Sequence, residues 1–573
     1  MVCRRRRSRN PDGVAFVEPP WSEQTAEFQA LDQRLSEDHL ARAIAQAVAA
    51  LDLSDFLTSY VGAGSPPYRP EMLLGVVLYE MHLGKRSPAE WARDARESEP
   101  VRWLLRGCEP SRARWYAFRD RVGPWLLDWN RQVLAQALDK KLTPAERAAL
   151  DGTLIAANAS RHHLLNEARL QQREAQLAEA IAADQGLPTV PRASTADVLA
   201  SPAAPDPVAV TEILVPAPDA AASVAPSVAV ATEATAPVSA AVPQAASAKM
   251  PGWMAKTPAG RQQQESRYQK ARARMEQRQQ RNQQKRASKQ QKRDKIVVSV
   301  SDSEAALGRD KLGVYRPLYN VQLLCDLDSP FILAYQVFAQ PNDNNTLGPM
   351  LERQTDLVGH KVSQWLADAG YPSGEHLALA EAAGVLLFAP WQENDYSVRN
   401  AKKGKKKVYY AKKEFRWLPE DQAYVCPNGQ RLKLEGTSKQ KRSGTETVLL
   451  NQYRCPPQAC QNCPLHAQCT PNPAAGRTIS RAEHEELIEA LRARMQTDEA
   501  KNLYRLRRQT VELSYADLKE HRKLRRFSGH GLSRAENEVG LEVLVHNLLT
   551  LVDTGQPRVS PRPAAPAPEK IGA

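Results

Sequence analysis

Apolar residues recur at helical spacing from about residue 20 to residue 147. The run at residues 73–81 is almost wholly apolar, and Ser87-Pro88-Ala89-Glu90 is typical of a helix N-cap followed by proline at the first helical position. Trp91, Leu104 and Trp115 continue the same spacing. The pattern predicts a small domain of short helices joined by Gly and Pro turns.

Shorter apolar segments with strand character follow. Residues 148–159 form a predicted strand that carries one acidic residue, Asp151. Residues 319–327 and 331–338 are joined by the turn sequence Asp328-Ser329-Pro330 and predict an antiparallel hairpin. The remaining elements are expected as a strand at 295–301, a helix at 347–358, a strand at 362–367, a helix at 374–383, a strand at 385–389 and helices from 481 to 552.

This order of elements is that of an α/β fold with a ribonuclease H-like mixed-sheet core. The core would carry a helical N-terminal domain, and a Cys-containing insertion would precede the last helices. The predicted boundaries are a basic disordered tail (1–20), the helical domain (21–147), the first strand and following helix (148–186), a linker (187–257), a basic segment (258–294), the core (295–390), the Lys- and Cys-containing insertion (391–480), the C-terminal helices (481–553) and a disordered tail (554–573).

Composition separates the insertions from the core. Residues 187–257 are rich in Ala, Pro and Val, which is typical of a flexible linker. Residues 261–295 are rich in Gln, Arg and Lys and show no apolar face, so we expect a solvated basic helix or a disordered segment. The insertion at 391–480 contains a run of lysines from Lys402 to Lys413 and five of the eight cysteines.

The charge balance limits the partners. Lys and Arg total 78 against 65 Asp and Glu, a net charge of +13, which favours a polyanionic partner such as nucleic acid or an acidic membrane surface. No apolar stretch is long enough to span a bilayer, and no apolar segment of a signal peptide follows the basic residues near Met1. We therefore expect a cytoplasmic protein with reduced thiols.

Two aspartates stand at predicted central strands, Asp151 in the first strand and Asp368 at the end of the strand at 362–367. Two carboxylates on neighbouring strands, with a third from a helix packed over them, can hold two divalent ions ~3.5–4 Å apart at a phosphodiester. Carboxylate oxygens suit Mg²⁺, or Mn²⁺ in its place.

A C-terminal helix offers the third carboxylate. At ~100° per residue, Tyr504, Arg508, Glu512 and Lys519 fall within about 80° of one another and share a face. In this arrangement Glu512 would bind metal, while the cations and the phenol would contact phosphate. The alternative is an ordinary Arg508–Glu512 salt bridge on a solvated face.

These motifs together resemble the DDE transposases of bacterial insertion sequences, in the branch with a Tyr-Arg-Glu-Lys signature and a helical N-terminal transposase domain. Asp151-Gly152-Thr153, Tyr319-Asn320-Val321-Gln322 and Asp368-Ala369-Gly370-Tyr371 resemble three of its motifs in order. Tyr504, Arg508, Glu512 and Lys519 resemble the signature helix, although the family places two residues, not three, between its tyrosine and arginine. Residues 68–71 and 83–87 resemble the family's N-terminal domain.

The resemblance implies a metal-dependent enzyme that cleaves the ends of its own insertion sequence and joins them to target DNA. Asp151, Asp368 and Glu512 would hold Mg²⁺ or Mn²⁺, and Tyr504, Arg508 and Lys519 would contact DNA. The partners would be double-stranded DNA (the element's terminal inverted repeats and the target), with a homodimer forming on DNA at the nucleoid and no membrane. The alternatives are a catalytically silent DNA-binding regulator or domesticated remnant, and a metal nuclease without strand transfer.

Other acidic residues compete for these roles. Asp302, Asp326, Asp328 and Asp343 lie near the predicted strands. Asp328 and Asp343 occupy a turn and a loop, where aspartate is common for local hydrogen bonding. Asp326 ends a strand and is therefore the strongest substitute ligand.

The cysteines of the insertion form a separate candidate site. Cys455, Cys460, Cys463 and Cys469 lie close together, and Cys426-Pro427-Asn428-Gly429 precedes them with a knuckle-like turn. In a reducing compartment this spacing favours a structural Zn²⁺ over disulfides. The alternative is a set of partly buried free thiols.

Overall fold

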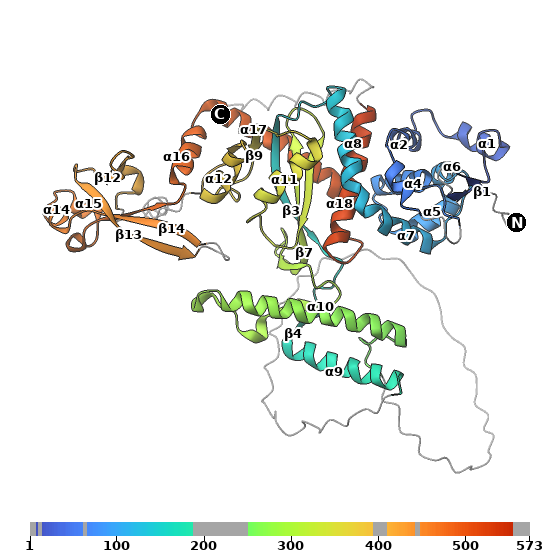
Figure 1. Ribbon diagram of the computed structural model, residues 1–573, viewed down its shortest axis with the longest axis horizontal. Helices are drawn as coiled ribbons and strands as arrows, with labels where there is room; N and C mark the ends of the chain where they lie inside the picture. The colour runs from blue at the N-terminus through green and yellow to red at the C-terminus, as the bar shows by residue number, and fades with distance from the viewer. Residues whose placement is uncertain are drawn as a thin grey trace, which may run out of the picture. The chain divides into compact units, whose positions relative to one another are not determined.

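The computed structural model describes residues 7–9, 14–60, 66–186, 250–392, 409–441 and 447–553 (Figure 1). Its contacts divide the chain into two units, residues 1–168 together with 270–573, and residues 169–269. The predicted linker up to residue 249, the lysines from Lys402 to Lys407 and the tail from residue 554 lie outside the described residues.

The N-terminal part of the larger unit is helical, as predicted. Ser87 caps its helix in a complete capping box with Glu90, and proline occupies the first turn. Trp91, Trp115 and Trp129 are almost fully buried in its core. The helices are α1 (Ala26–Arg34), α2 (Leu40–Ala49), α3 (Ser54–Thr58), α4 (Pro70–His82), α5 (Pro88–Glu97), α6 (Glu99–Leu104), α7 (Arg112–Val122) and α8 (Leu126–Asp139).

Residues 7–9 and 14–20 differ from the prediction of a basic disordered tail over 1–20. A short antiparallel ladder pairs β1 (Arg7–Arg9) with β2 (Ala15–Val17). Phe16 and Val17 are buried, and Val17 N donates to Pro67 O. This apolar pair explains why the segment is ordered despite its basic neighbours, because burying it against the helical domain compensates the cost of ordering the backbone.

A mixed sheet forms the centre of the larger unit. Its order is β10-β9-β3-β7-β6, with β8 also paired to β7. The pairs β10–β9 and β9–β3 are parallel, whereas β3–β7, β7–β6 and β7–β8 are antiparallel. The strands are β3 (Arg147–Ala156), β6 (Ala306–Arg309), β7 (Tyr315–Asp326), β8 (Ile332–Phe338), β9 (Gln364–Leu366) and β10 (Leu386–Phe388).

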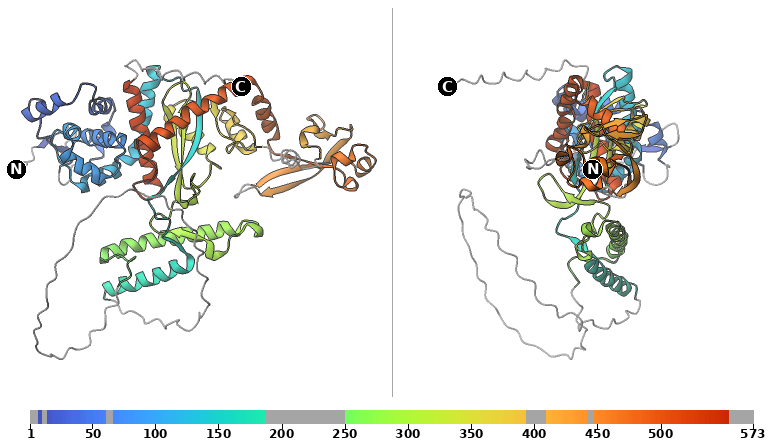
Figure 2. Two further views of the ribbon diagram at one scale, coloured as in Figure 1. Left: turned by 180° about the vertical axis from the view of Figure 1, so that it is seen from behind. Right: turned by 90° about the vertical axis from the view of Figure 1, so that its left-hand side faces the viewer.

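Helices cover this sheet, and most of them match the predicted positions. α11 (Leu347–Val358) packs on β8 and α8, and α12 (Gly374–Ala382) follows β9. α18 (Leu532–Asp553) lies beside α8, where the two helices run next to each other in both figures (Figure 1, Figure 2). α16 (Glu485–Arg494) and α17 (Asp498–Ala516) precede a π-helical turn at Asp517–His521. The predicted strand at 295–301 is the short β5 (Val297–Ser299), which pairs with β4 (Leu164–Asn166).

The insertion at 391–480 folds as a second sheet, which the sequence analysis did not anticipate. Its strands run antiparallel in the order β11-β12-β13-β14-β15. Phe415, Tyr424, Leu432, Tyr453 and Ile479 form its small core. The strands are β11 (Arg416–Leu418), β12 (Ala423–Val425), β13 (Arg431–Lys441), β14 (Thr447–Arg454) and β15 (Thr478–Ala482), with the short helices α14 (Pro457–Gln461) and α15 (His466–Cys469) between the last two.

The basic segment forms a helix, but the expectation that it has no apolar face is wrong. Most of α9 (Glu167–Asp184) and part of α10 (Pro258–Gln283) lie in the smaller unit. On α10, Tyr268, Ala271 and Met275 are buried at helical spacing. Three apolar residues among many Gln and Arg give a weak periodic signal, which explains why the sequence pattern did not reveal the face.

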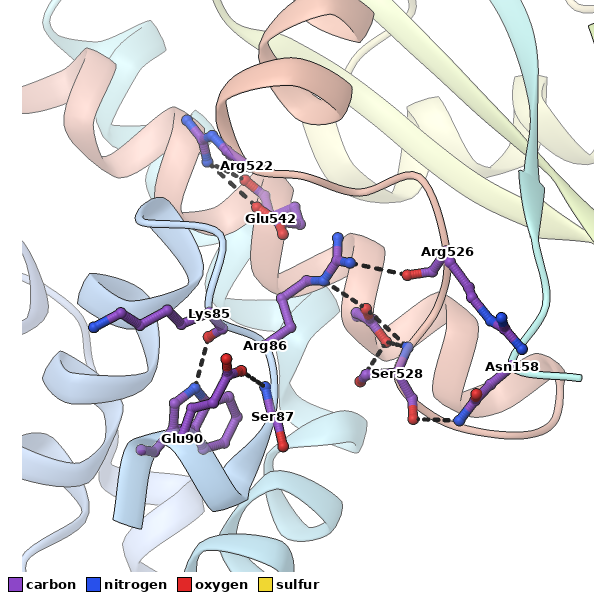
Figure 3. A network of polar contacts seen from close by, with 11 residues as sticks. Lys85, Arg86, Ser87, Glu90, Asn158, Arg522, Arg526, Ser528 and Glu542 are labelled. Carbon is purple, nitrogen blue, oxygen red and sulfur yellow. Dashed lines mark hydrogen bonds and ion pairs between the residues drawn. The ribbon is translucent and has the colours of Figure 1, made fainter. Parts of the chain in front are cut away.

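The helical domain meets the C-terminal segment through a buried polar contact (Figure 3). Arg86, in the loop between α4 and α5, donates to Arg526 O over 2.9 Å, and its Nε lies 3.1 Å from Glu538 Oε1. The Glu538 carboxylate also accepts from the Ser528 N–H and hydroxyl, both at 2.9 Å. On the far side of the same segment, Asn158 Nδ2 donates to Ser528 O over 2.7 Å, so one loop links the helical domain to the end of β3.

Candidate active site

The two candidate aspartates lie side by side because of the strand register. β3 and β9 are parallel neighbours with Ala149 opposite Leu366. Asp151 follows two residues later on β3, and Asp368 follows two residues later just past the end of β9, so the two occupy equivalent positions along neighbouring chain segments ~4.8 Å apart. Asp368 Oδ1 accepts from Gly370 N over 2.7 Å, which fixes the turn that leaves β9.

Asp151 carries an unfavourable surplus of negative charge. Burial raises its pKa, and the nearby carboxylates of Asp368 and Asp343 raise it further. The Arg507 guanidinium, whose Nη2 lies 2.9 Å from Asp151 Oδ1, opposes this increase. Three acidic groups therefore share one region with one closely paired cation.

Arg507 is a residue that the sequence analysis missed. It extends from α17 and its side chain is only 12% exposed, whereas the expected Arg508 is exposed. The family's spacing could have revealed it. The family places two residues between its tyrosine and its arginine, and Arg507, not Arg508, has this spacing from Tyr504.

Two of the predicted signature residues face this region. Tyr504 is half-buried, and burial raises its pKa. Among the nearby charges, Arg507 lowers this pKa, whereas Asp368 and Asp151 raise it. Lys519 Nζ donates to Thr153 Oγ1 from the π-helical turn, and burial lowers its pKa to about 8. Lys519 lies in the π-helical turn that follows Ala516, and from there its side chain reaches β3.

Glu512 is placed less closely than the other two predicted metal ligands. Its side chain is exposed, and it is not among the groups that act most strongly on the pKa of Asp151. Tyr515, one turn later, faces inward, and its hydroxyl oxygen lies 2.7 Å from Asp151 O and 2.9 Å from Val321 O, so its single proton is shared between these two carbonyl acceptors. The inward face of α17 thus carries Arg507 and Tyr515, and Glu512 lies toward its solvent edge.

Asp343, expected to be a loop residue with local bonds, reaches the site instead. Its Oδ1 accepts from Asn320 Nδ2 over 2.9 Å and from Gln322 Nε2 over 2.7 Å. Gln322 Oε1 accepts in turn from the Tyr371 hydroxyl. Gly152 lies opposite Gln322, and a Cβ there would come much closer than 3.0 Å to both Gln322 Nε2 and Asp343 Oδ1.

The other competing acids have structural roles. Asp326, expected to be the strongest substitute, pairs with Ala148, three residues before Asp151 on β3, and so lies ~10 Å along the sheet. It accepts from Thr143 Oγ1 over 2.6 Å and from Ser329 Oγ over 2.5 Å. Asp302 accepts from the Tyr319 hydroxyl over 2.7 Å, and Asp328 pairs with Arg147.

The donor set at Asp151 and Asp368 suits a hard divalent cation, because closely placed carboxylates lose their mutual repulsion when such an ion binds. Within the described part of the chain, however, no three His, Cys, Asp or Glu side chains are arranged so that they could hold a metal ion. The arrangement accounts for two carboxylate ligands, and the third stays a prediction.

The five cysteines of the insertion converge. Cys426, Cys455, Cys460, Cys463 and Cys469 line one small cavity of about 20 Å³ together with His466, which the sequence analysis did not single out. Burial raises the pKa of Cys455 well above its ordinary value, and the neighbouring thiols Cys460, Cys426 and Cys469 raise it further. The cavity brings the predicted ligands together, but zinc at this position stays a prediction, since no described trio has metal-holding geometry.

Comparison with known families gives two matches. Residues 425–552 match a family described as "Transposase DDE domain", and residues 29–121 match "Transposase domain (DUF772)". No curated protein and no solved structure gave a significant match. Among the described residues, no helix is both long enough and apolar enough to cross a membrane. The first match includes the cysteine cluster, α17 and α18, and the second covers most of the N-terminal helices. Two separate parts of the chain are thus similar to transposase domains, which confirms the resemblance to the DDE transposases of insertion sequences.

Proposed function

We propose that this transposase cleaves the ends of its insertion sequence and joins them to target DNA by metal-dependent phosphodiester chemistry. The observation that supports the proposal is the register of β3 and β9, from which Asp151 on β3 and Asp368 just past the end of β9 lie at equivalent positions. The strand order β8-β7-β3-β9-β10, with only the last two pairings parallel, supports a ribonuclease H-like core.

Asp151, Asp368 and Glu512 would hold Mg²⁺ or Mn²⁺. Bound there, two such ions would activate the attacking oxygen and stabilise the leaving oxygen. Glu512 would have to approach from the edge of α17, and the closeness of that helix to Asp151 through Arg507 and Tyr515 makes a short movement sufficient.

The protein's own cations would hold the DNA. Arg508 is exposed on α17 and can meet a phosphate directly. Lys519 and Tyr504 lie deeper, beside the strand that carries Asp151, and would position the reacting phosphate. Arg507 now neutralises Asp151, and it can transfer to a phosphate when a cation takes its place.

The proposed substrate is double-stranded DNA, namely the terminal inverted repeats and the target. The net charge of +13 favours such a polyanion. The helical N-terminal domain, which matches a transposase domain, would bind the element's ends. Because two ends are cut and joined together, a homodimer would assemble on DNA.

The experiment is a gel assay with labelled element ends, Mg²⁺ and a target plasmid. The parent should cleave and join, and Asp151→Asn, Asp368→Asn and Glu512→Gln should each bind ends without cleaving them. Cleavage without joining would instead indicate a nuclease, and a shift without cleavage a DNA-binding regulator. Glu512→Gln at the parent rate would remove Glu512 from the ligand set.

A further inference from the structure

The residues that fix the separation of Asp151 and Asp368 lie outside the predicted ligand set. Strand pairing sets the backbone distance, but Asp368 stands after the last paired residue of β9 and is held by the turn that follows. Tyr371 ends this turn, with its N–H 3.3 Å from Asp368 O. Whatever anchors Tyr371 therefore anchors the Asp368 turn.

Gln322 is that anchor. Its Oε1 accepts from the Tyr371 hydroxyl, and both side chains are fully buried. On β7, Gln322 lies directly opposite Gly152, the residue after Asp151. One side chain thus links the Asp368 turn to the point of the sheet where Asp151 stands.

Asp343 sets the orientation of the Gln322 amide. An amide can present either its oxygen or its NH₂ group to Tyr371, but an ionised carboxylate only accepts hydrogen bonds. Asp343 Oδ1 binds the Gln322 NH₂ group over 2.7 Å, which leaves Oε1 for the tyrosine. Asn320 Nδ2 donates to the same oxygen over 2.9 Å and to Asn342 O over 2.8 Å, so the Asp343 loop is itself held in place.

We propose that Gln322 and Asp343 are positioning residues, which through the Tyr371 hydroxyl hold the Asp368 carboxylate at the distance from Asp151 that a divalent cation requires. The inference rests on the proposed function. Gly152 is part of the same arrangement, because any larger residue there would displace the Gln322 amide and the Asp343 carboxylate. Hydrogen bonds that orient metal ligands typically change metal affinity by ~10–100-fold when they are removed.

The test is Mn²⁺ binding by the full chain, measured by electron paramagnetic resonance, with cleavage measured against Mg²⁺ concentration. Tyr371→Phe removes only the hydroxyl that binds Gln322. We expect Mn²⁺ affinity to fall by about tenfold. The Mg²⁺ concentration for half-maximal cleavage should rise in parallel, while the rate at saturating Mg²⁺ stays within about threefold of the parent.

Tyr319→Phe is the matched control. Tyr319 is also buried on the central sheet, and its hydroxyl donates to a carboxylate, Asp302, rather than to Gln322. It should lose similar stability without a change in Mn²⁺ affinity. If both variants weaken Mn²⁺ binding equally, the effect is general loosening and the proposal is wrong.

A second variant covers the case in which Tyr371→Phe does not fold. Asp343→Asn replaces a half-buried loop carboxylate by a group that can also donate, so the Gln322 amide is held less firmly and keeps only Asn320 Oδ1, at 3.0 Å, as an obligatory acceptor for its NH₂ group. It should reproduce the loss of Mn²⁺ affinity, whereas Asp328→Asn, in a turn at the other end of the sheet, should not. Unchanged affinity in Asp343→Asn would overturn the proposal, and a parent that binds no Mn²⁺ and does not cleave would overturn the proposed function with it.

Discussion

Two groups of carboxylates within the described residues differ in how their charge is balanced, one at the candidate active site and one where the helical domain meets the C-terminal segment. At the domain contact, Glu538 faces Arg86 and the Ser528 N–H, and Arg522 Nη1 lies 3.7 Å from Glu542 Oε2. Burial raises the pKa of Glu542 to about 8, so this group also loses its charge by binding a proton at neutral pH. The domain contact therefore carries little uncompensated charge.

The candidate site is built differently. The carboxylates of Asp368 and Asp343 raise the pKa of Asp151, Arg507 is its closely paired cation, and Asp368 is held by a backbone N–H. Compensated burial indicates a structural role, whereas an uncompensated surplus of like charge at one point indicates a site for a cation. The comparison predicts opposite responses to substitution in the two regions.

The largest expected effect is on cleavage. Asp151→Asn and Asp368→Asn should each lower the cleavage rate by about 10³-fold or more, because several kcal/mol of charge stabilisation in the transition state is lost. Stability should change by less than about 1 kcal/mol, since the substitutions relieve repulsion within the acidic group. Cleavage rates and denaturation curves of the same preparations measure both quantities. Strong destabilisation would instead indicate that these aspartates have a structural role, like the carboxylates of the domain contact.

The cysteine cluster of the insertion offers a second test of whether side chains of one kind that lie close together indicate a metal site. We expect about one zinc per chain in the parent and none in a Cys460→Ser, Cys463→Ser variant, with the insertion losing much of its stability because metal binding and folding are coupled. Elemental analysis and chelator titration give the answer. Unchanged stability under chelator, with no zinc in either protein, would leave ordinary packing as the source of this fold.

The domain contact should respond in stability and not in chemistry. Arg86→Met leaves Glu538 buried without its cation and should cost roughly 3 kcal/mol, measured by chemical denaturation at pH 8. Cleavage should persist below the melting temperature. Arg34→Met, which breaks an exposed pair with Glu99, is the matched control and should cost at most about 1 kcal/mol. Equal costs would mean that burial of the contact contributes nothing.

The smallest effect is a pH dependence at Glu542. Its pKa of about 8 in the folded state exceeds the unfolded value of about 4.3, so the native state holds an extra proton between these values and stability falls as pH rises through that range. Glu542→Gln cannot lose this proton. The stability of the parent relative to the variant should fall by about 2 kcal/mol from pH 5 to pH 9, roughly half of the full shift because local relaxation raises the effective dielectric. Parallel pH profiles would contradict the assignment.

Local signals in the sequence predicted much of the fold. The helix N-cap at Ser87, α11 and the hairpin of β7 and β8 depend on residues close in sequence, and each was predicted within a few residues. The sheet of the insertion was not predicted, because apolar alternation is short in both strands: β13 is polar after Leu434 except for Gly436, and the apolar residues of β14 are mostly consecutive, at Val448, Leu449 and Leu450.

The site was predicted less completely, for a physical reason. Asp151 and Asp368 follow from strand order, but the role of Asp343 depends on amides that reach it from another strand. A loop aspartate with a distant partner looks the same in sequence as one that bonds its own turn. Lys519 was predicted from its spacing on the signature helix, but the π-helical turn that carries it was not.

The pairing of β3 with β7 also has a consequence for how the chain emerges from the ribosome. Ala156 pairs with Leu318, so at 5–20 residues per second roughly 8–30 s separate the synthesis of the two strands. During this delay β3 has no partner at either edge, because β9 is made later still. An apolar strand with open edges promotes aggregation. Nascent chains that end between the two strands should therefore need a chaperone, although the helical domain before them can already have folded.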